Sequence, residues 1–376
     1  MTDTPSTPST GTGTDRITSL DAVRGWAVLG ILTMNIVSFG LGTSAYFNLD
    51  DSSPQSTADW VVGVAGEIFF DQKFMAMFSM LFGAGIALFS DRAAARSGRP
   101  ALLSLWRNSL LLAFGLLHGL LWDGDVLQVY ALCAPVLIVV RGWSPRTLAS
   151  TGLVVMAMSP LGALLAQASV GAGGEGLGEY WGASGELSDP VGLWLLADFF
   201  ARSLGMMLLG IAAYRIGFLS GSLPRSVFRT SAIRGLVMGL PLSALGVAWL
   251  AAGDFGPERA VVASIPNTIA TVPVALAYIS LVILWHGRAS GGALDRRIRC
   301  VGRMALTNYL AQTAVGLFLL DVVLDGVEVG RLGLLGVAAV IWALQLWWSP
   351  WWLRRHRFGP AEWLWRAATY GRRPGS

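Results

Sequence analysis

The chain has 376 residues, of which 54% are hydrophobic and only 13% charged, and its mean hydropathy is +0.57. Soluble domains carry about 25% charged residues, so this composition excludes an ordinary soluble domain and predicts an all-α integral membrane protein in a lipid bilayer. The formal charge of +4 resides on arginines in short loops between apolar segments, so nucleic acid is not an expected partner.

The two ends of the chain differ from its apolar body. Residues 1–15 are rich in Ser, Thr, Pro and Gly and have no apolar run, which predicts a disordered leader rather than a signal peptide. We expect residues 16–356 to form one polytopic transmembrane domain and residues 357–376 a cytoplasmic tail. Cys133 and Cys300 lack CxxC or CxxH spacing, so we expect no metal site there.

Ten apolar segments are assigned as membrane spans. A helix that crosses a bilayer needs about 20 mostly apolar residues. The predicted architecture is therefore a polytopic bundle of about ten transmembrane helices. The segments are 22–42, 67–90, 102–121, 125–140, 147–168, 191–219, 233–252, 261–285, 301–320 and 333–353.

The loop charges orient these spans. Loops 43–66 and 169–190 contain carboxylates and neither Lys nor Arg. The loops that alternate with them are basic. Because Lys and Arg favour cytoplasmic loops, both termini are predicted to be cytoplasmic. The arginines of the basic loops are Arg92, Arg96, Arg99, Arg141, Arg146, Arg225, Arg229, Arg234, Arg288, Arg296, Arg297 and Arg299.

One connection between two spans carries three ionisable residues. It reads FGLLHGLLWDGDVLQVYA, residues 114–131, and joins the third span to the fourth at the predicted outer face. Gly124 between Asp123 and Asp125 predicts a tight turn. His118 then lies just inside the membrane, where an ionisable side chain is costly and marks a candidate functional site.

Two pairs of polar residues repeat at the same spacing. Arg24 and Asn35 are eleven residues apart, as are Arg107 and His118. Eleven residues make about three helical turns, so each pair shares a helix face and is separated by roughly 16 Å. If the two helices pack together, two arginines lie at the cytoplasmic mouth, with Asn35 and His118 at similar depth above them.

A histidine in this position is suited to general-base chemistry. Neutral imidazole can take a proton from an alcohol or amine that attacks an acyl carbon, and Asp125 or Asp123 can hold the ring in the required tautomer. Further intramembrane polar residues are candidates for binding substrate. These are Lys73, Arg202, Arg303, Asn308, Tyr309 and Gln312.

Structural explanations for the same residues stay open. His118 lies within Gly115-xxx-Gly119, a small-residue motif typical of helix contacts, so it can be a structural hydrogen-bonding residue. Asp123 and Asp125 can be ordinary turn residues. Asn308 and Gln312 can link helices, and arginines near a cytoplasmic face follow the positive-inside rule without any further role.

Five blocks of sequence resemble the YeiB-like bacterial membrane proteins, known as domain of unknown function 418. The resemblance covers nearly the whole chain and implies a multi-pass protein of the bacterial plasma membrane. The blocks are RITSLDAVRGWAVLGILTMNIVSFG (16–40), KFMAMFSMLFGAGIALF (73–89), HGLLWDGDVLQVYAL (118–132), GRMALTNYLAQT (302–313) and FGPAEWLWRAATYG (358–371).

The first block is also similar to the start of lysosomal heparan glucosaminide acetyltransferase and of acyltransferase family 3. This resemblance implies transfer of an acyl group from cytoplasmic acyl-CoA to a hydroxyl or amine acceptor on the far side of the membrane. Those families carry a histidine near or just after the first span, where this chain has Asn35 and a loop 43–66 without histidine. For an acyltransferase, this departure implies either that the base has moved to His118 or that the chemistry differs.

The resulting hypothesis assigns a role to each residue group. Arg24, Arg107 and Arg303, with Asn35, would hold the acyl-CoA donor. His118 would act as base, oriented by Asp125 or Asp123. The acceptor and the oligomeric state are left open, with a homodimer as one alternative. The residues assigned to substrate binding are Lys73, Arg202, Asn308, Tyr309 and Gln312.

Two other functions fit the same sequence. The first is a transporter or exporter of a small organic molecule along the same polar path, although the chain shows no internal repeat of the kind that many transporters have. The second is a non-enzymatic partner or sensor in the cell envelope.

Overall fold

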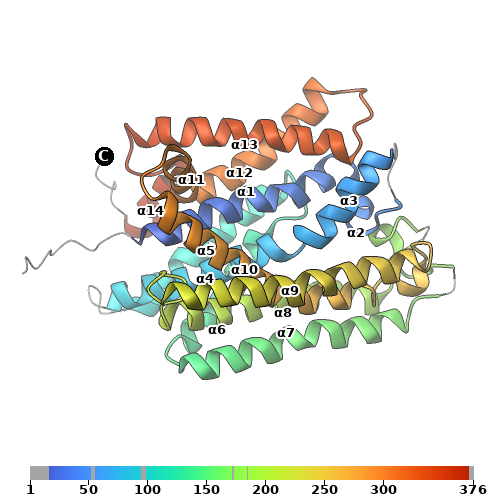
Figure 1. Cartoon of the computed structure of the whole chain (residues 1–376), viewed down its shortest axis with the longest axis horizontal. Coiled ribbons are helices and arrows are strands. Elements are labelled where there is room, and N and C mark those ends of the chain that lie inside the picture. The colour runs from blue at the N-terminus through green and yellow to red at the C-terminus, as the bar shows by residue number, and fades with distance from the viewer. Residues whose placement is uncertain (1–16, 52–55, 95–98, 172, 184, 372–376) are drawn as a thin grey trace, which may run out of the picture.

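Helices account for the architecture of the chain. The computed structural model describes residues 17–51, 56–94, 99–171, 173–183 and 185–371. These residues form helices joined by turns and loops (Figure 1), which confirms the predicted all-α membrane class. The leader predicted for residues 1–15 lies outside the described residues.

Most of the long helices run roughly along the long axis of Figure 1. In chain order the α-helices are α1 (Thr18–Gly40), α2 (Gly42–Phe47), α3 (Thr57–Phe69), α4 (Lys73–Ala94), α5 (Pro100–Gly119), α6 (Val126–Val140), α7 (Pro145–Gln167), α8 (Asp189–Arg215), α9 (Arg225–Ala251), α10 (Ser264–Ala289), α11 (Ala293–Arg303), α12 (Ala305–Phe318), α13 (Arg331–Leu353) and α14 (Pro360–Tyr370). Short helical turns are η1 (Gly178–Tyr180), η2 (Pro257–Arg259) and the π-helical η3 (Leu319–Val323) that extends α12.

Nine predicted spans have counterparts long and apolar enough to cross a membrane within the described ranges. The tenth, α6, has 15 residues and a rise of about 22 Å, less than the roughly 30 Å of a hydrocarbon core. The predicted spans therefore match helices in position, and the segment predicted at 125–140 is a helix too short to cross the hydrocarbon core unaided. Figure 1 places the beginning of α1 and helix α14 at the same end of the bundle, as an even number of crossings requires.

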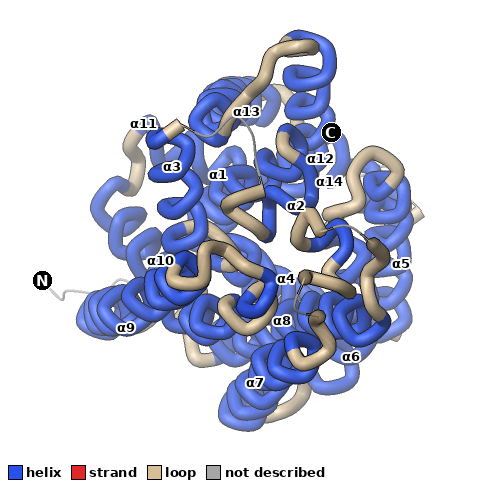
Figure 2. The backbone as a smooth tube through the Cα atoms, turned by 90° about the vertical axis from the view of Figure 1, so that its right-hand side faces the viewer, coloured by secondary structure: helices blue, strands red, loops and turns tan. Residues whose placement is uncertain are grey.

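The bundle has an inner and an outer group of helices. Figure 2 looks along the bundle and places α5, α7, α9 and α13 at its periphery, with α1 and α4 nearer the centre. The most apolar window of α1 is 67% buried inside the protein, against 22% for α5 and α9. The inner helices therefore meet other helices on most sides, and the outer ones present an apolar face to lipid.

Close contact between inner helices depends on glycine. A Cβ added at Gly83 of α4 would lie 2.2 Å from the carbonyl oxygen of Met207, and one at Gly210 of α8 would lie 2.1 Å from that of Met80. These positions admit no side chain, so α4 and α8 approach backbone to backbone. Small residues at such crossings are typical of helices packed in membranes.

The segment between α3 and α4 breaks one long apolar stretch into two helices. Gln72 has a φ of 63°, a left-handed conformation that is costly for a residue other than glycine. The backbone N–H groups of Phe70 and Asp71 both donate to the carbonyl oxygen of Gly66. Because of this break, Asp71 and Lys73 both have buried side chains at the start of α4.

The C-terminal segment, predicted as a tail, folds against the bundle as α14. Glu362 accepts hydrogen bonds at the start of α12, from the N–H of Leu306 at 2.7 Å and from the N–H and hydroxyl of Thr307 at 3.1 and 2.5 Å. A carboxylate at a helix N-terminus satisfies otherwise unpaired donors. Burial raises the pKa of the Glu362 carboxyl, and the hydrogen bonds from α12 oppose that shift.

The glycine crossing can be tested by adding a side chain. We expect Gly210→Leu to lower the free energy of unfolding by about 1–3 kcal/mol or more, because it forces α8 away from α4. Gly336→Leu on α13 is the matched control, since a Cβ there meets no atom within 4 Å. Thermal unfolding of the detergent-solubilised protein measures both, and equal transition temperatures would contradict the close crossing.

Candidate functional site

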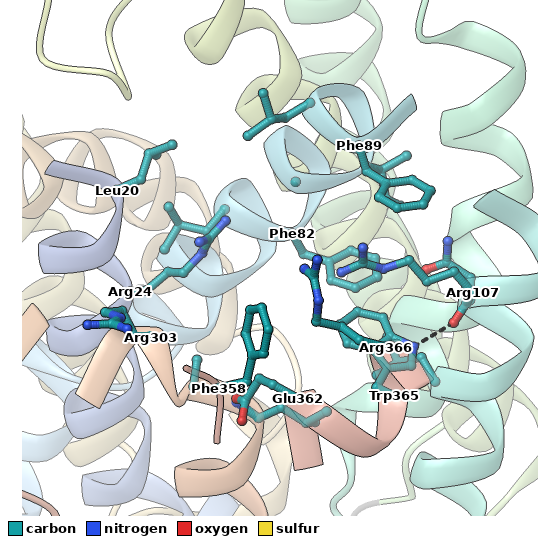
Figure 3. A pocket seen from close by; sticks show the side chains of 18 of the residues that line it. Leu20, Arg24, Phe82, Phe89, Arg107, Arg303, Phe358, Glu362, Trp365 and Arg366 are labelled. Carbon is teal, nitrogen blue, oxygen red and sulfur yellow. Dashed lines mark hydrogen bonds between the residues drawn. The ribbon is translucent and has the colours of Figure 1, made fainter. Parts of the chain in front are cut away.

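An elongated cavity of about 890 Å³ enters the bundle from one end. Helices α1, α4, α5, α12 and α14 contribute to its walls (Figure 3). Along α4 the lining runs from Ala93 to Phe78, which corresponds to about 22 Å of helix. We call this the inner cavity, and the end of the bundle at which it opens the arginine-rich end.

The rim of the inner cavity is strongly basic. Six arginines line it, against the two carboxylates of Asp21 and Glu362. Such an excess of one charge in a cleft with apolar walls attracts anions. The six are Arg24, Arg92, Arg107, Arg303, Arg357 and Arg366. Of these, Arg24, Arg107 and Arg303 had been assigned to the donor from the sequence.

Helix α14 holds one of these arginines in place. The guanidinium of Arg107 lies 4.0 Å from the ring centre of Trp365 and 4.4 Å from that of Phe89. The indole N–H of Trp365 donates to the carbonyl oxygen of Arg107 at 2.8 Å (Figure 3). Stacking on two aromatic faces stabilises the cation and leaves its planar fork in a fixed direction.

The pairing of Arg24 with Arg107 differs from the expected arrangement. Figure 3 shows the two arginines on opposite walls of the cavity, so α1 and α5 face each other across it rather than meeting directly. Asn35, expected at the depth of His118, is not among the described residues that line the cavity. The eleven-residue spacing was correct for Arg107 and His118, which both point into the protein, and did not predict the gap between the helices.

His118 and Asp125 form the buried polar pair at the predicted connection. Nδ1 of His118 lies 2.9 Å from Oδ1 of Asp125, and both side chains are almost completely buried. Helix α5 ends at Gly119, the chain turns, and Asp125 is the residue that precedes α6. The turn brings together two residues that lie seven apart. Asp123 is exposed, so the carboxylate in contact with the histidine is that of Asp125.

Helix α12 completes the polar network. The hydroxyl of Thr313 lies 2.9 Å from Nε2 of His118, and the hydroxyl of Tyr309 donates to Oδ1 of Asp125 at 3.0 Å. An ionised carboxylate can only accept, so this contact with an ionised Asp125 requires the hydrogen on Nδ1 of His118. In the neutral ring, Nε2 then accepts from the Thr313 hydroxyl, which is the protonation state a general base requires.

Thr313 is the member that the sequence interpretation missed. It follows Tyr309 by four residues, and residues four apart share a helix face. This four-residue spacing could have indicated Thr313. A single threonine in an apolar helix does not by itself indicate a functional site.

Tyr309 separates the network from the inner cavity. It lines the cavity, and its ring centre lies 5.3 Å from that of His118. His118 is not among the described residues that line the cavity, so the cavity ends one side chain, that of Tyr309, short of the histidine. Phe78 stacks on Tyr309 with ring centres 6.4 Å apart and closes the same end.

The remaining predicted substrate residues lie in two other places. Lys73 donates to the carbonyl oxygen of Glu67 at 2.8 Å and to the side chain of Asn267, and Arg202 is paired with Asp198. Asn308 donates to Ser349 of α13 at 3.0 Å, and Gln312 donates to the carbonyl oxygen of Val28 of α1 at 2.9 Å. Asn308 and Gln312 therefore link helices, which was the structural explanation considered for them beside substrate binding.

Comparison with known proteins gives this chain a family. A family model described as "Protein of unknown function (DUF418)" matches residues 213–372. The "Uncharacterized protein YeiB" of Escherichia coli (strain K12) is 32% identical over 391 residues, covering 94% of this chain and 96% of that protein. The chain belongs to the DUF418 family. The "Uncharacterized protein YxaH" of Bacillus subtilis (strain 168) is 28% identical, covering 95% and 94% of the two chains.

The family match confirms the resemblance drawn from the sequence blocks. The DUF418 segment contains Arg303, Tyr309, Thr313 and Glu362, and therefore part of the cavity wall and half of the polar network. His118 and Asp125 precede that segment, and YeiB is similar over 94% of the chain. Membership also agrees with a multi-pass membrane protein.

The protonation of His118 is open to direct measurement. The chain has three histidines, so ¹⁵N spectra of histidine-labelled protein are assigned with a His286→Gln, His356→Gln double variant. In the neutral imidazole we expect the hydrogen of His118 to lie on Nδ1 and Nε2 to be bare, because Asp125 accepts from Nδ1. A protonated Nε2 with a bare Nδ1 would contradict the network and remove the basis for a general base.

Proposed function

We propose that this DUF418 protein is an acyltransferase of the plasma membrane. It would take an acyl group from acyl-CoA at the arginine-rich end and transfer it to a hydroxyl or amine that approaches from the opposite end. The observation that carries this proposal is the inner cavity, whose basic rim lies at one end and whose deep end, Tyr309, is hydrogen-bonded to the buried His118–Asp125 pair.

The shape and charge of the inner cavity favour a phosphorylated, amphiphilic donor. Guanidinium groups bind phosphates with paired hydrogen bonds, and the rim provides several of them. Farther in, the walls are formed by apolar side chains that suit an acyl chain and its linker. These include Phe78, Phe82, Ile86, Leu111 and Leu127.

The chemistry assigned to the network is general-base catalysis. The acceptor would replace the Thr313 hydroxyl at Nε2 of His118 and give its proton to that nitrogen while its oxygen or nitrogen attacks the thioester carbon. The carbon–sulfur bond then breaks, and the departing CoA thiolate takes the proton from the imidazolium. Asp125 stabilises the imidazolium between these steps. Tyr309 must turn aside for the thioester to reach the histidine.

A second candidate function, transport, is favoured by a second cavity at the opposite end. This outer cavity, of about 90 Å³, is lined in part by Met75, one turn of α4 from Phe78 of the inner cavity. Tyr130 lies between them: its hydroxyl donates to the carbonyl oxygen of Met75 at 3.2 Å, and its ring stacks on Phe78. Two cavities on either side of such a layer also fit a transporter.

The experiment that separates the two candidates uses purified protein in nanodiscs with acetyl-CoA and palmitoyl-CoA. We expect binding of at least one donor and release of free CoA, detected with a thiol reagent. His118→Ala should lower the rate of release by about 10²–10⁴-fold with binding retained, since that is the usual contribution of a general base. Asp125→Asn should lower the rate as well, with exposed Asp123→Asn as its matched control.

The donor site is tested separately by arginine variants. Arg107→Gln and Arg303→Gln should raise the KM for acyl-CoA with little change in kcat, because they contact the donor away from the reacting carbon. Exposed Arg229→Gln on α9 is the control. If the wild-type protein binds neither donor, the acyltransferase proposal fails and transport takes its place. If turnover survives His118→Ala, the base is wrongly assigned.

A further inference from the structure

The outer cavity has chemistry that the acyl-CoA proposal does not use. It lies at the end of the bundle opposite the arginine-rich end, lined by α2, the α3–α4 junction, α8, α9 and α10. Its volume is about 90 Å³. One water needs roughly 10–15 Å³ of such space, so the cavity holds about six to nine non-hydrogen atoms. A ligand of that size is a small molecule rather than a lipid chain.

Three buried donors line this cavity without a protein partner. Among the residues that the structure describes, Nε1 of Trp194, Nε of Arg202 and Oγ of Ser243 have no hydrogen-bond partner. Arg202 is 7% exposed and Ser243 is fully buried. Arg202 also remains paired with Asp198 through its NH2 group. Buried donors require acceptors, so these donors call for an oxygen-bearing group such as a carboxylate.

Carboxylates also line this cavity, in addition to Asp198, which is paired with Arg202. Asp71 accepts from the amide of Asn267 at 2.7 Å and from the hydroxyl of Tyr46 at 3.3 Å. Lys73 donates to the side-chain oxygen of Asn267, which fixes the direction in which that amide donates to Asp71. Glu67 contributes a second carboxylate to the lining. These two carboxylates favour a cationic group.

Aromatic side chains complete the walls. A cation over an aromatic face is stabilised by the negative charge of the ring face, and the cavity offers several such faces. A small amine bound next to Glu67 and Asp71 would therefore gain from both charge and ring contacts. The aromatic residues are Tyr46, Phe47, Tyr180, Trp181, Trp194 and Phe199.

We propose that the outer cavity binds a small free zwitterion of amino-acid size. Its carboxylate lies on Arg202 and Ser243, and its ammonium group lies between Glu67, Asp71 and the aromatic rings. This binding goes beyond the acyltransferase proposal and does not depend on it, since a transporter would use the same site.

The test measures binding of radiolabelled glycine and L-alanine to the full-length protein in nanodiscs by equilibrium dialysis. Acetate and methylamine serve as the two halves of the ligand, and O-phosphoethanolamine represents the zwitterion of a lipid headgroup. We expect glycine or alanine to bind at least about tenfold more tightly than either half, because each half leaves one set of charges unpaired.

Isosteric variants locate the site. Ser243→Ala and Glu67→Gln should each weaken amino-acid binding about tenfold, and the exposed pair Ser226→Ala and Glu258→Gln should leave it unchanged. Thermal unfolding of every variant checks the fold. Absence of binding by both amino acids would overturn the proposal, as would acetate or methylamine binding equally well. Preference for O-phosphoethanolamine would assign the cavity to a lipid headgroup and overturn it too.

Discussion

The Asp125 carboxylate is the group on which the centre of this membrane protein depends. A charge buried among apolar helices is costly unless it is paired and hydrogen-bonded. Oδ1 of Asp125 lies against His118 of α5 and accepts from Tyr309 of α12, and the backbone of Asp125 directly precedes α6. One oxygen atom therefore fixes three helices relative to one another and sets the tautomer of the histidine.

Polar groups are arranged differently inside the bundle and at its arginine-rich end. Inside the bundle, polar groups are tied to one another, as Lys73 is to Asn267 and Arg202 to Asp198. At the arginine-rich end, several guanidinium groups line a wide cavity, and α14 forms one of its walls. The basic opening is followed by apolar walls, and the ring of Tyr309 separates the deep end of the cavity from the hydrogen-bonded His118.

The sequence predicted the helices well because span length, apolar composition and loop charge are local properties. It also predicted that Asp125 or Asp123 would orient His118, and the packing of the turn decides that the contact is with Asp125. It did not predict Thr313, the cavity between Arg24 and Arg107, or the docking of α14, which depend on how distant helices pack. Asn308 and Gln312 show the same limit. Their polar side chains were compatible with substrate binding and with contacts between helices, and only the packing shows that they link helices.

The central claim is that an acyl chain enters from the arginine-rich end and reaches Tyr309. Photo-crosslinking with an acyl-CoA that carries a diazirine at the end of its chain, followed by peptide mass mapping, tests it most directly. We expect labels on deep cavity residues such as Phe78, Leu111 and Tyr309, and we expect these labels to be lost when unlabelled acyl-CoA competes. Labels confined to exposed positions such as Leu165 and Leu193, unchanged by competitor, would contradict it.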